Sequence, residues 1–430
     1  MRLYSILSFV FIILSLLLYT HYFNFILWKE TNGPKFIWLF ITACIILLLF
    51  VAKRIEWKDI NNERIFLLFL IPLIAEIVKY IFSPQTIETA RISVLMSIAT
   101  LQYYLLKGLK VTEKQIMYAF SIFGLITLAL QIYQQLPNVI PMFGIIANDE
   151  SYIGAARNDL YRFYVGCYFI AVICSYYWWT VFLKKKTIFS LLLFICFISS
   201  IYIYLIRQLM VVSMITLVLT IYFIKDTKVK RNIYIILFLI GILLVSFYDA
   251  LFSEMVEDYT TDTWTTDIRF KCIDFVLVQI FDNPIQALIG HGHDIIEQKW
   301  MRMHYFLSDI GFIGESYYYG LSWLLLFVST FYSYVFKYKS IPLYIKLYMI
   351  ATMIDSLFIF PYRTNDEMFI WICLLYIGHI YIDKSGYGCC QVVERKKRKI
   401  LVKLLMRNRI YSLFIPYLII KNKLNNRYND

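Results

Sequence analysis

The sequence predicts an all-α fold, a polytopic membrane helix bundle of about 12 transmembrane helices with one large extracytoplasmic loop that contains short helices. Three observations predict it. The 430 residues are 60% hydrophobic and 19% aromatic, far above a soluble average. Long apolar runs recur along the chain, and the joints between them alternate between basic and basic-poor. We therefore expect one membrane bundle in residues 1–382 rather than several globular domains.

The apolar runs define the expected elements. A span needs about 20 apolar residues, within a range of about 17 to 25. The first run follows Met1-Arg2 without a small-residue cleavage site, so we expect an uncleaved anchor rather than a signal peptide. The predicted spans are 3–27, 36–52, 65–82, 91–106, 116–134, 162–183, 187–206, 208–224, 232–248, 311–336, 342–360 and 367–382.

The charges in the joints give the orientation independently of hydropathy. Lysine and arginine gather in alternate joints, which the positive-inside rule assigns to the cytoplasm. The longest joint, 249–305, has ten acidic residues against Arg269, Lys271, Lys299 and Arg302, so we expect it to face outward. An even number of spans then places both termini in the cytoplasm. The basic joints contain Lys53, Arg54, Lys58 and Arg64, then Lys107, Lys110 and Lys114, then Lys184, Lys185 and Lys186, then Lys225, Lys228, Lys230 and Arg231, and finally Lys337, Lys339 and Lys346.

Residues 383–430 form a basic cytoplasmic tail. It carries twelve lysines and arginines against three acidic residues, so it holds most of the net charge of +13. Leucine and isoleucine alternate with this charge, which is typical of a helix lying on anionic lipid. Nucleic-acid binding is the alternative, but membrane anchoring already explains the charge, so we expect membrane lipids and no nucleic acid as partners.

Arg207 is the first candidate site residue. Runs 187–206 and 208–224 meet there almost without a loop, and one continuous helix of about 55 Å would be too long for a bilayer, so the chain must turn. Charge alternation puts this arginine on the outer side, against the positive-inside trend. We interpret it as an anion ligand. The alternative is a snorkelling arginine bound to lipid phosphate or to an acid of the long loop.

Within the long loop, Arg269 opens an apolar-rich segment whose spacing predicts an interfacial or short re-entrant helix. The segment ends at the Asn283-Pro284 turn signal and continues into residues 287–293, which would bring the loop back to the membrane. The guanidinium of Arg269 could then join Arg207 above one cavity. A surface salt bridge to Asp267 or Asp274 is the alternative.

The long loop also holds three of the five histidines, His291, His293 and His304. Histidine can ligate zinc or transfer a proton near neutral pH. The spacing matches no strong zinc signature, so we expect no metal. His304 is the candidate general base, because it directly precedes the return of the chain to the membrane; a histidine simply hydrogen-bonded within the loop is the alternative.

Two charged residues interrupt the third apolar run. Glu76 and Lys79 are three residues apart and share one helix face. We expect them to neutralise one another, and the alternative is an ion pathway.

A run of short motifs leads from the long loop into the next apolar run. It consists of Asp267-Ile268-Arg269, Asp282-Asn283-Pro284, Leu288-Ile289-Gly290-His291-Gly292, His304 and Ser308-Asp309-Ile310-Gly311-Phe312-Ile313-Gly314, followed by Tyr319-Gly320. In order, these are an arginine near the start of a large loop, an Asn-Pro turn, a Gly-x-Gly, a histidine and a glycine-bearing helix re-entry. This order resembles the bacterial O-antigen polymerase and O-antigen ligase superfamily, in which the large loop is periplasmic.

The resemblance implies a glycosyltransferase that polymerises oligosaccharide repeat units linked to undecaprenyl diphosphate, at the outer face of the bacterial inner membrane. It implies neither metal nor cofactor, and it adds a chain-length regulator and a flippase as partners. An O-antigen ligase that uses a lipid A core acceptor is the nearest alternative, and a lipid-linked glycan transporter is the second. The implied catalytic residues are His304, Arg269 and Arg207, and the implied substrate-binding residues are Arg157, Arg162, Asp309, His291 and His293.

Overall fold

The structure is a computed structural model, and the chain forms two compact units, Met1–Gly378 and His379–Asp430. In the second unit, the Nε2 atom of His379 lies 3.0 Å from Oδ2 of Asp383. The predicted basic tail lies outside the described residues beyond Ser385. The described residues are 2–19, 33–52, 64–82, 100–136, 156–157, 160–161, 168–204, 207–231, 233–234, 263–292, 305–357 and 365–385.

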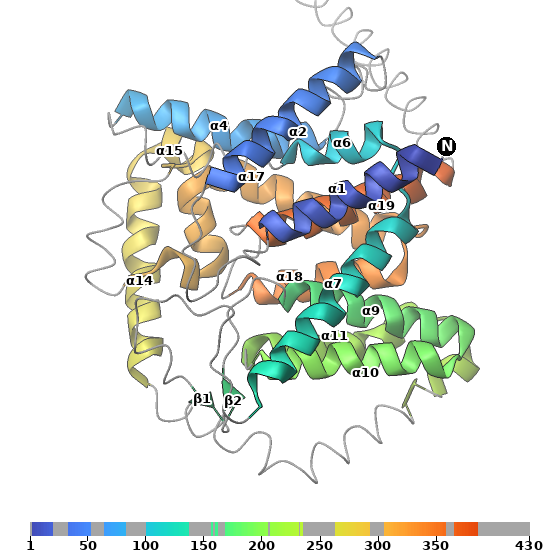
Figure 1. Ribbon diagram of the computed structural model, residues 1–430. Coiled ribbons are helices and arrows are strands. Elements are labelled where there is room, and N and C mark those ends of the chain that lie inside the picture. Colours follow the sequence, from blue (N-terminus) through green and yellow to red (C-terminus); the bar gives the residue numbers. More distant parts are fainter. Residues whose placement is uncertain are drawn as a thin grey trace, which may run out of the picture. The chain divides into compact units, whose positions relative to one another are not determined.

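Helices dominate the described residues, which confirms the predicted all-α class (Figure 1). Two short strands, β1 (Ala156–Arg157) and β2 (Leu160–Tyr161), pair antiparallel. A 3-10 helix, η1 (Leu307–Asp309), precedes α17, and a π-helix, η2 (Ser333–Lys337), follows it. The α-helices are α1 (Arg2–Tyr19), α2 (Gly33–Val51), α4 (Arg64–Phe82), α6 (Gln102–Gly108), α7 (Glu113–Gln134), α9 (Tyr168–Lys185), α10 (Ile188–Ile203), α11 (Arg207–Phe223), α14 (Thr263–Asp282), α15 (Pro284–Ile289), α17 (Gly311–Tyr332), α18 (Leu343–Asp355) and α19 (Asn365–Lys384).

Most predicted spans coincide with one of these helices, but the twelve-span count is not confirmed. Among the described residues, two helices are long and apolar enough to cross a membrane, Glu113–Tyr133 and Gly311–Lys337. α6 has 7 residues and α18 has 13, which is shorter than a bilayer crossing requires. Apart from residues 233–234, the predicted span 232–248 lies outside the described residues.

The core of the first unit lies between closely packed apolar helices. α9 packs along α10, and α18 packs against both α9 and α11 (Figure 1). Large aromatic side chains fill the space between the helices, and Trp179, Trp323 and Trp371 are almost completely buried. Each such side chain removes about 150–250 Å² from solvent, so these rings contribute much of the packing energy.

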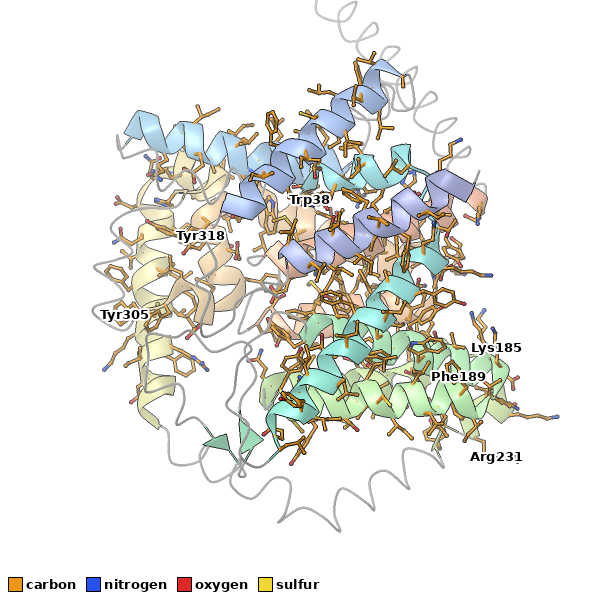
Figure 2. All side chains as sticks on the ribbon, viewed as in Figure 1. Trp38, Lys185, Phe189, Arg231, Tyr305 and Tyr318 are labelled. Atoms are coloured by element: carbon orange, nitrogen blue, oxygen red, sulfur yellow. The ribbon has the colours of Figure 1, made fainter. Side chains whose placement is uncertain are left out.

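One end of this bundle gathers the basic joints that the structure describes, and we call it the basic end. There Tyr344, at the start of α18, donates a hydrogen bond of 2.8 Å to the Glu113 carboxylate at the start of α7. The Lys346 ammonium lies 5.8 Å from the centre of the Phe223 ring at the end of α11. In Figure 2, Lys185 at the end of α9 and Arg231 after α11 lie toward the same edge of the view. These joints are the ones that the charge pattern of the sequence assigns to one side of the membrane, and they lie together at the basic end.

The opposite end, which we call the polar end, is marked by buried polar contacts between helices. The Ser200 hydroxyl of α10 donates to Oε1 of Gln131 in α7 over 2.8 Å. Tyr168, at the start of α9, donates its hydroxyl to Glu367 at the start of α19. At the polar end, α10 also stops and α11 begins, with Arg207 as its first residue. The predicted turn at Arg207 is thus confirmed.

Candidate functional site

The loop motif is built into a broken helix. Gly320 has φ 78° and ψ 166° inside α17, which interrupts the helical hydrogen bonds at this point. The backbone N–H of His291 donates to the Tyr317 carbonyl over 2.7 Å, and the N–H of Gly292 donates to the Tyr318 carbonyl over 3.0 Å. The returning loop therefore supplies partners to backbone groups that the break exposes, as an apolar environment requires.

Glycine is required on both sides of this contact. Gly290 has φ 106°, and a Cβ atom built on it would lie 2.3 Å from the Tyr318 carbonyl oxygen. A Cβ atom built on Gly320 would lie 2.3 Å from the Leu288 carbonyl oxygen. Since both neighbours are backbone atoms, neither can rotate away. The backbone of the loop at Gly290 therefore packs directly against the backbone of α17 at Gly320.

His291, between the two loop glycines, has a mainly structural environment. Its ring stacks on Tyr317 with a centroid distance of 4.4 Å and an interplanar angle of 4°. Its Nε2 atom is buried, and the residue as a whole is half-buried. The substrate-binding role expected for His291 stays a prediction, and the position of its ring is explained by packing.

A buried ion pair lies beneath the loop. The Lys79 ammonium lies 3.3 Å from Oε2 of Glu76, and both side chains are almost fully buried in α4, which confirms the predicted pairing. A Cβ atom on Gly292 would lie 3.0 Å from Oε1 of Glu76 and 3.0 Å from Cδ of Lys79. Gly292 therefore rests directly on this pair.

Arg269 belongs to α14, which is longer than the sequence predicts. Arg269 does not open the helical segment as expected, because the helix already begins at Thr263 and runs for 20 residues. Its side chain is exposed, yet its position is in line with the buried stripe of Cys272, Val276 and Ile280. The buried stripe is the face of α14 that packs on α17. Arg269 therefore lies where this face of α14 continues toward the start of the helix.

Asp309 lies close to the same part of α14. It ends η1, just before α17, and is half-buried. Burial raises the pKa of the Cys272 thiol to about 11, and the nearby charge of Asp309 contributes to this shift. Cys272 is three residues from Arg269, or about 5 Å along the helix axis. The structure therefore brings Asp309 within about one turn of Arg269.

The turn predicted at Asn283-Pro284 is confirmed, whereas the predicted return of the chain to the membrane at His304 stays a prediction. The Asn283 side chain caps α15 by accepting a hydrogen bond of 3.0 Å from the Ile285 N–H, and Pro284 follows at the first helical position. The chain is described again from Tyr305, whose ring centroid lies 5.7 Å from that of Phe275 in α14.

Several predicted site residues have no described side chain. Arg207 begins α11 and Arg157 lies in β1, but only the backbone of each is described. His304, His293 and Arg162 lie outside the described residues. The described part of the site thus consists of Arg269, Asp309 and the contact around His291.

Sequence reasoning missed the buried acids of the polar end. Asp355 is 5% exposed, Glu367 is 1% exposed and Glu315 is 3% exposed. Glu367 accepts from Tyr168, and the Gln208 amide donates to Asp355. The signal was present in the sequence, because an acidic residue within an apolar run is costly unless a specific partner holds it.

No protein-family model matches the chain, and no curated protein matches it.

Proposed function

We propose that the chain is a membrane glycosyltransferase that polymerises oligosaccharide repeat units linked to undecaprenyl diphosphate, for O-antigen, capsule or exopolysaccharide synthesis. The proposal rests on one observation: motif residues that are far apart in the sequence lie close together around α14, α15 and α17. Gly290 and Gly320 meet at the break of α17 and connect α15 to α17. Arg269 continues the packed face of α14, and Asp309 lies close to Cys272 on that face.

The arrangement of charge supports an extracytoplasmic site. The described basic joints gather at one end of the bundle, and the positive-inside rule assigns such an end to the cytoplasm. Arg207 begins a helix at the other end. Figure 1 shows α14 running crosswise to the α9–α10 pair, as expected of a helix that lies along a membrane surface rather than across it.

The chemistry follows from these residue types. A hydroxyl of the acceptor unit attacks the anomeric carbon of the donor, and the bond from that carbon to the diphosphate oxygen breaks. The diphosphate leaves with the electron pair and gains negative charge, which guanidinium groups such as Arg207 and Arg269 bind through paired hydrogen bonds. His304 accepts the hydroxyl proton. Direct displacement inverts the anomeric centre.

Asp309 and the remaining basic residues complete the proposed site. The Asp309 carboxylate can accept hydrogen bonds from sugar hydroxyls, which suits an acceptor glycan. Arg157 and Arg162 belong to the outward joint 135–161 and its edge, where further cations would contact the donor headgroup. None of these steps uses a metal ion or a nucleotide sugar.

The test uses purified full-length protein with lipid-linked repeat units in the presence of a chelator. Wild type is expected to lengthen the glycan. Arg269→Ala should lower the rate by roughly 10² to 10³, the loss typical when one donor to a developing anion is removed. Lys271→Ala is the matched control, because it removes an exposed cation from the same helix on a different face. Equal activity of the two variants would remove Arg269 from the mechanism.

A further inference from the structure

A polar clamp lies directly beside Arg207. The Nε2 atom of Gln208, the second residue of α11, donates to Oδ1 of Asp355 over 2.5 Å and to the Asp355 backbone carbonyl over 3.2 Å. Asp355 is the last residue of α18. The clamp therefore joins the beginning of α11 to the end of α18 at the polar end of the bundle.

The carboxylate of this clamp is fixed by its surroundings. Asp355 is 5% exposed, and a buried carboxylate is costly unless hydrogen bonds hold it. Its charge acts on the fully buried Tyr176 hydroxyl of α9, which in turn lies beside Ser213 and Thr216 of α11. The clamp thus joins α11 to α18, and a buried polar side chain of α9 lies within the electrostatic range of its carboxylate.

We propose that Gln208 and Asp355 are positioning residues, which fix the first turn of α11 so that Arg207 is held at the polar end for the leaving diphosphate. The clamp acts on the residue next to Arg207, so a shift of the α11 start moves the arginine directly. The role of Arg207 in this inference rests on the proposed function. A misplacement of about 1 Å commonly costs on the order of 10² in rate.

The activity test compares substitutions with a matched control. Gln208→Leu removes the hydrogen-bond donor and should lower kcat by roughly tenfold or more. A loss of this size corresponds to a partial misplacement of Arg207, since a full misplacement costs on the order of 10² in rate. Gln131→Leu is the control, since it also removes a buried amide at the polar end and breaks the bond from Ser200. It should leave kcat within about twofold of wild type, because α7 carries no proposed site residue.

Substitutions of the acceptor separate hydrogen bonding from charge. Asp355→Asn keeps an oxygen that can accept from Gln208, so it should retain most activity, whereas Asp355→Ala should resemble Gln208→Leu. Equal loss in both Asp355 variants would overturn the positioning role, because the negative charge itself would then be required. Equal kcat in Gln208→Leu and Gln131→Leu would overturn it as well.

A second readout does not depend on catalysis. With the other cysteines replaced, Arg207→Cys is labelled by a membrane-impermeant maleimide, and the labelling rate reports the environment of this position. Adding Gln208→Leu should change the rate several-fold, while adding Gln131→Leu should not. An unchanged labelling rate would overturn the positioning role of Gln208. If the rate changes but wild type neither lengthens glycan nor binds undecaprenyl diphosphate in nanodiscs, the clamp stands and the proposed function fails.

Discussion

Gly290→Ala tests the contact on which the candidate site depends. Gly290 has φ 106° and ψ 164°, a backbone conformation that is essentially restricted to glycine. The added Cβ atom would lie 2.3 Å from the Tyr318 carbonyl oxygen and 2.7 Å from the Gly320 amide nitrogen. Because both are backbone atoms of α17, the loop has to move away from the broken helix.

The cost has two parts. Holding alanine in this conformation costs about 1–3 kcal/mol. Moving the loop away breaks the hydrogen bonds from the His291 and Gly292 N–H groups, at about 0.5–1.5 kcal/mol each. The whole effect is therefore about 2–6 kcal/mol in the free energy that holds the loop on α17, enough to release it in a large fraction of molecules.

Two measurements check this value. Thermal unfolding of the purified variant should begin at a lower temperature than in wild type, and hydrogen exchange should rise in α15 and at Gly292. Gly124→Ala is the matched control, because Gly124 lies within the regular helix α7 and its added Cβ meets the edge of the Phe197 ring. Phe197 is fully buried, so its ring has to shift slightly, and the gain of about 1 kcal/mol from the helix preference of alanine offsets part of that cost. If Gly290→Ala were as stable as Gly124→Ala, the reasoning would be refuted.

Two further substitutions give independent predictions. Glu76→Leu or Lys79→Leu alone should destabilise the protein by about 3–5 kcal/mol, because each removes the opposite charge that lies next to a buried charge. The double variant should recover most of the loss. Thermal unfolding of the four proteins measures this, and full stability of the single variants would contradict it. With its pKa at about 11, Cys272 as the sole cysteine should react with iodoacetamide faster as pH rises beyond about 8.5, where an ordinary thiol is half ionised. Asp309→Asn removes a negative charge that raises this pKa, so the pH profile of Cys272 alkylation should move to lower pH. An unchanged profile would show that Asp309 does not act on Cys272.

Local signals in the sequence were sufficient for several features. The Asn283-Pro284 pair predicts a turn because both residues act on their own backbone, and it caps α15. The spacing of Glu76 and Lys79 predicts their pairing because residues three apart share a helix face. The turn at Arg207 followed from length alone, since one helix through both runs would exceed the bilayer.

Features that depend on distant partners were not predictable from the same patterns. The break at Gly320 is stabilised by the loop containing His291, and nothing local to α17 reveals that this loop donates to it. The start of α14 at Thr263 was missed because the expectation followed the apolar residues, which begin only at Phe270. The clamp between Gln208 and Asp355 joins two helices far apart in the sequence, and hydrophobic periodicity carries no information about such pairs.

The most direct test of the central claim is the stoichiometry of polyprenyl diphosphate release in proteoliposomes supplied with lipid-linked repeat units and a chelator. Repeat-unit polymerisation predicts one polyprenyl diphosphate released for each repeat unit added, with both quantities falling together in Arg269→Ala. Lipid-linked glycan that crosses the bilayer without diphosphate release would instead identify a transporter. Release that requires a lipid A core acceptor would identify a ligase, and either result would contradict polymerisation.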